Sequence, residues 1–385
     1  SSIIRKLKLT NSIYFNQRLF DGKLPFGSGG IVDLNRSFWG YKLNMNFKGL
    51  LNYDLGLSYN SQKDDRQRFI NDEGVKTDQV MGQYENYENI SLYFFGSKSI
   101  QRFNFSVGAR LENNIISMEG YFNPVEKKIK KINSFNPSIN ILYELNKIDL
   151  FGNFSSGYET PTLNELSATA NQSGFNENLK TIKSNTFEFG FANSRTGQTV
   201  NYSLRLFNIS TSNEITPFQL SDGLVLYRNA GKTIKRGAEI ELGIKITDQL
   251  NFDYSASVGD YKFESFKFIE NDFSNNIMPG IPQSNQSIKL SYTNENNYNL
   301  IVGLKRVGKM FADNANETEI DGYNSVSIKM SKNLKIFKTS MIPFISIDNL
   351  LNEKYFDNIR INAFGSRFYE PASGINIIGG LKINL

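Results

Sequence analysis

Apolar and polar residues alternate one by one along most of this chain. Between Tyr41 and Lys48 every second residue is apolar, and Lys42, Asn44 and Asn46 stand between them. The same alternation recurs in residues 7–16, 51–59, 103–112, 234–246 and 375–383. A period of two marks a strand with one apolar and one polar face, and no segment shows a helical period over a dozen residues. The pattern therefore predicts an all-β chain.

The lengths of the strands and of their connections favour a membrane barrel over a soluble sandwich. The predicted strands often run to about ten residues or more, whereas strands in soluble proteins average about five or six. Short links (48–50, 96–100, 146–147, 193–198, 247–249 and 294–297) alternate with long ones (20–35, 62–83, 117–131, 160–182, 212–225, 262–283, 309–319 and 350–372). Short periplasmic turns alternating with long extracellular loops are typical of outer-membrane barrels. Residues 1–385 are thus interpreted as one transmembrane antiparallel β-barrel domain of about sixteen strands.

Several apolar faces end in aromatic residues, as expected where a strand meets the membrane interface. Examples are Tyr41, Tyr59, Tyr143 and Tyr158. No apolar run approaches the roughly 20 residues of a membrane helix, and alternating strands need none. By the parity of the links, the last strand runs inward and ends at the periplasm, with Ile375, Ile377, Leu381, Ile383 and Leu385 towards lipid.

The composition of the 385-residue chain excludes several kinds of chemistry. It contains no Cys and no His, so disulfides, thiolate or imidazole metal sites and a Ser-His-Asp triad are all excluded. The net charge is only +5, and no dense Lys/Arg block indicates nucleic-acid binding. The oxygen-rich segment 313–317 lacks the spacing of an EF-hand calcium loop. We therefore expect no enzyme activity, cofactor, bound metal or nucleic-acid partner.

A series of short motifs occurs in a fixed order over the last 230 or so residues. They are "GYETPTLNEL" (157–166), "NENLKTIKSNTFEFG" (176–190), Asn-Ala-Gly (229–231) followed by Gly-x-Glu (237–239), Pro-Gly-x-Pro (279–282), "GKMFADNANETEIDGY" (308–323), "ISIDNLLNEKYF" (345–356) and "RFYEPASGINIIGGLKINL" (367–385). Together they resemble the TonB-dependent receptors of the Gram-negative outer membrane, most of all those for iron chelates. Two departures are Thr181-Ile182, where the family usually has Pro-Glu, and the terminal Leu385, where it usually has an aromatic residue.

The resemblance implies an integral outer-membrane receptor for a scarce nutrient. Such receptors are 22-stranded barrels closed by a plug, so the sequence is interpreted as the C-terminal barrel portion, without the plug and first strands. The implied function is TonB-driven uptake of a ferric siderophore or other iron chelate. The alternatives are a passive porin of about sixteen strands and a TonB-dependent receptor for cobalamin, an oligosaccharide or a peptide. The implied partners are TonB through the missing plug, membrane lipid and lipopolysaccharide, the chelate, and the N-terminal part of the same receptor.

Candidate substrate-binding residues lie in the predicted long loops or just beyond their ends. Guanidinium forks bind carboxylate-rich or anionic chelates well. For each residue, a solvated loop charge is the alternative reading. The candidates at the extracellular mouth are Arg66, Arg68, Tyr84, Arg228, Arg360 and Arg367.

Overall fold

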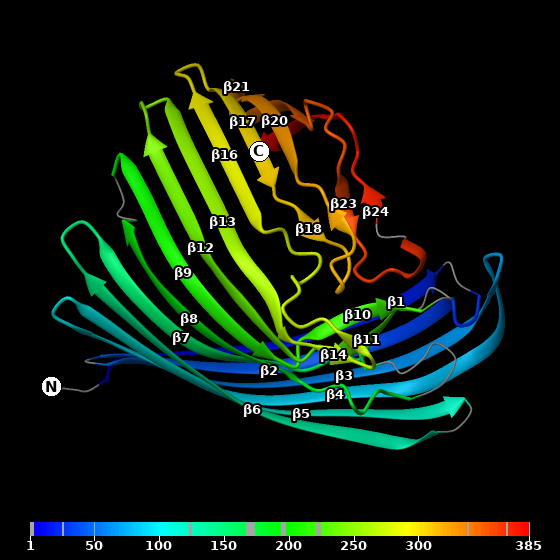
Figure 1. Ribbon diagram of the computed structural model, residues 1–385. Helices are drawn as coiled ribbons and strands as arrows, with labels where there is room; N and C mark the ends of the chain where they lie inside the picture. Colours follow the sequence, from blue (N-terminus) through cyan, green and yellow to red (C-terminus); the bar gives the residue numbers. More distant parts are fainter. Residues whose placement is uncertain are drawn as a thin grey trace.

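One antiparallel sheet dominates the computed structural model, which describes residues 4–24, 27–49, 51–122, 125–166, 174–193, 198–220, 225–336, 339–366 and 369–384. The sheet is curved and contains strands from both ends of the chain, and the longer loops turn into its concave side (Figure 1). Each strand pairs with its neighbours in chain order. Among the described residues no helix is long and apolar enough to cross a membrane.

The main sheet contains sixteen strands, because β20 and β21 are two parts of one strand interrupted at Asn333. These strands are β1 (Ile4–Lys23), β2 (Ile31–Gly49), β3 (Asn52–Asp72), β4 (Val75–Ile100), β5 (Phe103–Phe122), β6 (Val125–Glu144), β7 (Asp149–Glu159), β8 (Ile182–Asn193), β9 (Val200–Ser212), β12 (Lys232–Lys245), β13 (Leu250–Ser265), β16 (Ser284–Thr293), β17 (Tyr298–Val307), β20 (Tyr323–Lys332), β21 (Leu334–Ile336), β22 (Thr339–Asp348) and β25 (Asn376–Asn384). The predicted all-β fold and strand number are confirmed.

The loops at one end of the sheet contain four short hairpins. They are β10 (Ile215–Gln219) with β11 (Val225–Asn229), β14 (Lys267–Phe268) with β15 (Asn271–Asp272), β18 (Met310–Phe311) with β19 (Glu319–Ile320), and β23 (Phe356–Ile359) with β24 (Tyr369–Pro371). A 3-10 turn, η1 (Phe364–Ser366), stands between the last two. All four hairpins belong to connections that were predicted to be long and extracellular.

Three other connections predicted to be long are instead strands. β3 runs on to Asp72 and β4 starts at Val75, while β5 ends at Phe122 and β6 starts at Val125. The predicted loop 20–35 is likewise mostly the ends of β1 and β2. The prediction was wrong there because it placed strands only where apolar and polar residues alternate. The outer halves of β3 and β6 are rich in charged and polar residues, yet their backbones stay paired.

The two faces of the sheet differ in the way the alternation predicts. One face carries exposed apolar side chains, among them Leu92 on β4, Leu111 on β5 and Phe135 on β6, which lie side by side. Aromatic pairs border this band: the rings of Trp39 and Tyr59 are 5.1 Å apart at one limit. Phe103 and Tyr143, 4.5 Å apart, lie at the opposite limit. Such a band between aromatic girdles is the lipid-facing surface of a barrel.

The opposite face is polar and forms the inner wall. Asn60, Asn89 and Asn114 on β3, β4 and β5 form a ladder in which each amide donates to the next carbonyl oxygen, at 3.2 and 2.8 Å. Further out, Leu166, Phe175 and Leu179 of the β7–β8 connection pack on apolar residues of β5 and β6. Each such buried side chain contributes about 1.5–3 kcal/mol. This packing draws the loop inward over the wall.

Candidate substrate site at the extracellular mouth

A buried cluster of charges occupies the inner wall of β2, β3 and β4 beyond the apolar band. Arg36 donates to both carboxylate oxygens of Asp64, at 2.9 Å from Nε and 2.6 Å from Nη2. Arg66 makes a similar forked pair with Glu85, at 2.9 and 3.1 Å. The strands position these groups because cross-strand neighbours on one face lie close together. Arg36 faces Asp64, and Asp64 faces Glu85.

The third arginine of the cluster is left without a carboxylate partner among the described residues. Arg68 is buried and donates from Nη1 to the carbonyl oxygen of Gly29 at 3.2 Å, while its Nε has no partner. Burial lowers the pKa of Arg68 to about 10. The cluster of three guanidinium groups and two carboxylates therefore carries one excess positive charge. An anionic ligand group would be attracted to it.

A cavity of about 490 Å³ lies beside this cluster, beneath the start of the β7–β8 loop. Arg36, Gln62 and Tyr87 form its wall, and residues 160–164 cover it. The cover is shaped by a reciprocal pair: the Thr162 amide donates to Glu165 Oε2 at 2.8 Å, and the Glu165 amide donates to Thr162 Oγ1 at 3.2 Å. This pair explains the Thr and Glu of the motif at 157–166. It directs the next residue, Leu166, into the apolar contacts with Phe175 and Leu179 described above.

Of the other four predicted site residues, the three that the structure describes do not join this cluster. Tyr84 lies next to Gln83 but on the opposite face of β4, 50% exposed, with its ring 4.8 Å from that of Tyr121. Arg360 is exposed and paired with Glu370 at 2.6 Å. Arg367 lies outside the described residues. Of the five predicted site residues that the structure describes, only Arg66 and Arg68 lie together.

Arg228 lies on β11, in a separate part of the mouth. Its guanidinium carbon is 3.8 Å from the ring centroid of Phe268 and 4.9 Å from that of Phe218. Burial lowers the pKa of this arginine, and its Nε has no hydrogen-bond partner. This arginine therefore belongs to a second polar pocket.

Sequence reasoning missed Arg36, Asp64 and Glu85, which complete the cluster. The available signal was Asp64, Arg66 and Arg68 at spacings of two, which places all three on one face of a strand. That signal was hidden because residues 62–83 were assigned to a loop.

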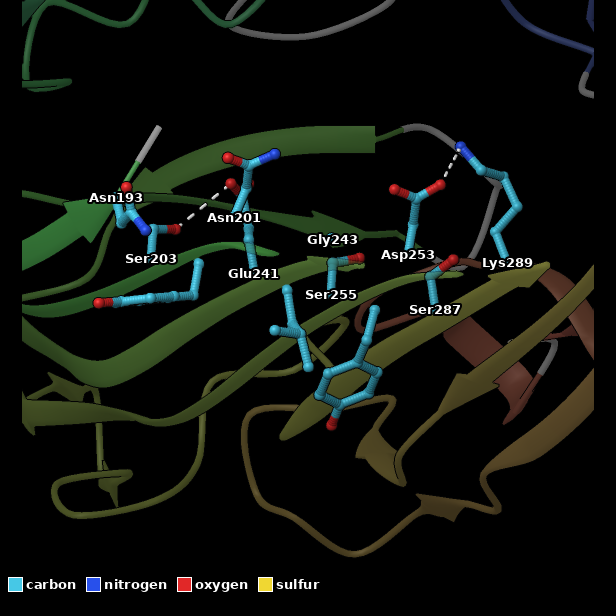
Figure 2. Close-up of a pocket in the computed structure, with 12 residues that line it drawn as sticks. Asn193, Asn201, Ser203, Glu241, Gly243, Asp253, Ser255, Ser287 and Lys289 are labelled. Atoms are coloured by element: carbon cyan, nitrogen blue, oxygen red, sulfur yellow. Dashed lines mark hydrogen bonds and ion pairs between the residues drawn. The ribbon is translucent and has the colours of Figure 1, made fainter. Parts of the chain in front are cut away.

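A second groove lies at the other end of the inner wall, near the short turns (Figure 2). It has a volume of about 370 Å³ and is lined by residues of β8, β9, β12, β13 and β16. Asp253 and Lys289 point toward one another across it and form an ion pair of 2.9 Å. Ser203 Oγ donates to Glu241 Oε2 at 3.3 Å. The groove thus presents charges of both signs to the lumen.

The fold, the two faces and the polar lumen define an integral barrel of the Gram-negative outer membrane. The TonB dependent receptor-like beta-barrel family model matches residues 4–350, so the chain belongs to this family. Its members are receptors and transporters, which confirms the expectation that the chain is not an enzyme.

Individual relatives are more distant. The chain is 25% identical to the ferrioxamine receptor of Yersinia enterocolitica over 182 residues. This matched segment is 46% of this chain and 24% of that protein. Among solved structures it resembles the ferric citrate transporter FecA (TM-score 0.78, 16% identity, 98% of this chain and 59% of that one). It also resembles the siderophore receptor PiuA from Acinetobacter baumannii (0.75, 14%, 99% and 62%) and the copper transporter OprC (0.77, 13%, 100% and 63%). The chain spans about three fifths of these structures and about a quarter of the ferrioxamine receptor.

Proposed function

We propose that the chain forms most of the barrel of a TonB-dependent receptor that takes up a ferric siderophore or similar iron chelate. The iron assignment rests on the likeness to the ferrioxamine receptor. The arginine cluster supports it, since Arg36 lines the 490 Å³ cavity and Arg68 of the same cluster has no carboxylate partner among the described residues. Guanidinium groups bind the oxygen atoms of anionic chelates. A chain without His and Cys is poorly suited to bind bare metal ions.

The polar side chains of the inner wall are evidence for a plug domain as a further partner. The groove of Figure 2 and the adjoining row formed by Arg205, Glu239 and Lys305 present charges and hydroxyl groups that protein side chains can pair with. We propose that a plug from the N-terminal part of the same receptor packs here and carries the segment that TonB contacts. Lipid and lipopolysaccharide would surround the apolar face.

The passive porin remains the main alternative, and one observation speaks against it. A closed barrel of sixteen strands requires β25 to pair with residues 3–15, that is, with β1. Among the described residues β1 pairs with β2 alone and β25 with β22 alone. Receptors for other nutrients share this fold, since a copper transporter matches as well as the iron transporters do. The fold by itself therefore does not select the substrate.

Growth on defined iron sources tests the proposal. A strain that lacks the gene should fail to grow when one ferric chelate is the sole iron source, and should grow normally on free iron. Complementation with Arg68→Gln should restore growth less well than complementation with Arg360→Gln, because Arg68 is the unneutralised cation of the cluster. Normal growth of the deletion strain on every chelate would refute the iron assignment.

A further inference from the structure

Four extracellular loops meet at one point, held together by asparagine side chains. The amide of Asn276 donates to the carbonyl oxygen of Asn314 at 2.8 Å, and that of Asn316 donates to Ile277 O at 2.8 Å. Asn362 Oδ1 accepts the backbone N–H of Asn314 at 2.9 Å. Its amide donates to a carbonyl oxygen of the β10 strand at 2.9 Å. We call this place the loop junction.

The loop junction borders a partly open cavity of about 230 Å³. Arg228, Phe273, Asn314 and Asn362 line it, together with acidic residues described below. A water molecule takes about 30 Å³ in the liquid, so the cavity has room for a fragment of about eight non-hydrogen atoms. A whole iron chelate is far larger. The cavity therefore suits one arm or end group of a ligand.

Arg228 brings a guanidinium group to this cavity. No carboxylate of the described residues forms an ion pair with it. The rings of Phe218, Phe266 and Phe268 surround the guanidinium, with centroids 4.9, 5.6 and 3.8 Å from its central carbon. These rings restrict its orientation, but they offer no hydrogen-bond acceptor of the strength of a carboxylate. Its Nε is buried and has no hydrogen-bond partner.

Asn314 brings an unused amide group. Its side chain is 2% exposed, and neither Oδ1 nor Nδ2 has a hydrogen-bond partner. Buried polar atoms without partners are rare and costly, so each requires an explanation. A free donor and a free acceptor on one planar group match the N–H and C=O of an amide or similar group. The neighbouring asparagines of the loop junction, by contrast, are all hydrogen-bonded.

The acidic residues at the cavity limit the charge of the ligand. Both carboxylate oxygens of Asp313 already accept backbone N–H groups, those of Glu317 and Thr318, at 3.0 and 2.9 Å. The Glu317 side chain is exposed at the rim. Because backbone N–H groups hold Asp313 and Glu317 faces solvent, the Arg228 guanidinium remains available to one carboxylate, while the two acidic groups disfavour a polyanion such as citrate.

We propose that the loop junction binds an N-acylamino-carboxylate end group, –CO–NH–CHR–COO⁻, with the carboxylate on Arg228 and the amide on Asn314. This unit has about eight non-hydrogen atoms when R is hydrogen and the acyl group is acetyl, which matches the cavity. The inference rests on the proposed function only where it names the molecule that carries this end group. The end group is an arm of the transported chelate, or it is the free end of a peptide.

Binding of small probes to the purified receptor in detergent tests the site without any chelate. Ligand-observed NMR titrations would compare N-acetylglycine, which has both groups, with N-acetylglycinamide and with propionate. Each of the latter lacks one feature, so each should bind about tenfold more weakly, because an unmade hydrogen bond to a buried partner costs this much. Citrate should not compete. Arg228→Gln should abolish the preference for N-acetylglycine over N-acetylglycinamide, and Asn314→Leu the preference over propionate.

Two controls keep the test decisive. Arg228→Lys preserves the charge and should retain the carboxylate preference, and Arg360→Gln changes an exposed arginine outside the cavity and should alter nothing. Equal binding of all three probes to the unaltered receptor, or an unchanged preference in Arg228→Gln, would overturn the proposal. Competition between N-acetylglycine and the transported chelate identifies the chelate as the source, and competition by a peptide with a C-terminal glycine identifies a peptide end. Failure of the iron-growth test would leave the probe result unaffected, so the two proposals fail separately.

Discussion

Replacing Glu85 by glutamine removes one charge from the buried pair between β3 and β4. The side chains of Arg66 and Glu85 are 8% and 3% exposed, so solvent screens their attraction little. Burial raises the pKa of Glu85, while the Arg66 pair and a 2.6 Å hydrogen bond from Gln83 favour the charged form. Without this carboxylate, the cluster has three guanidinium groups and one carboxylate, a net charge of +2 in place of +1.

The expected cost follows from this burial. Breaking a buried ion pair by removing one partner costs about 3–5 kcal/mol, because the remaining charge is desolvated and unpaired. This corresponds to a factor of about 150 or more in the equilibrium for local opening. Hydrogen–deuterium exchange of the β3 and β4 amides, measured by mass spectrometry, reports that equilibrium. The amides of residues 62–70 and 81–88 should exchange about two orders of magnitude faster in Glu85→Gln.

A double variant separates the ion pair from simple packing. Replacing Arg66 by Met and Glu85 by Leu removes both charges and keeps apolar volume next to the buried Met118, the residue of β5 that pairs with Glu85. Such replacements are often neutral or stabilising. The double variant should therefore recover most of the protection lost in Glu85→Gln. Unchanged exchange in the single variant would refute the reasoning, as would exchange in the double variant that is as fast as in the single one.

Two other variants test the faces of the sheet. Gly56→Ala should lower the free energy of unfolding by about 1–3 kcal/mol, because a Cβ at this glycine would stand 1.9 Å from the Tyr93 ring. Gly152→Ala is the matched control, since a Cβ added there would have no neighbouring atom within 4 Å. Equal effects of the two variants in urea titrations would contradict this packing. Leu206→Arg places a charge on the lipid face and should cost about 2–4 kcal/mol or prevent insertion. Ser257→Arg, on the inner wall, should insert normally, and the reverse result in a membrane-fractionation assay would invert the assignment of the faces.

The candidate site was predicted only in part. Arg66 and Arg68 were identified as mouth residues, and they do lie in one buried cluster. Their partners Asp64 and Glu85 come from β3 and β4, whose pairing at these positions carries no apolar pattern. Arg228 was identified as well, but nothing local to it indicates Asn314, which is 86 positions further along the chain. A contact between loops depends on how each loop folds back, and no single loop encodes that.

The sequence by itself determined the all-β fold, the two faces of its strands and the family. Alternation is a local property, and a strand expresses it in the same way whichever strand it pairs with. For the same reason, the polar lumen and the lipid-facing band could be assigned residue by residue. Only the tertiary structure decided that β3 to β6 continue far beyond the apolar band, and that the loops turn inward over the wall. Those features depend on ion pairs and packing between segments far apart in sequence, which no local pattern records.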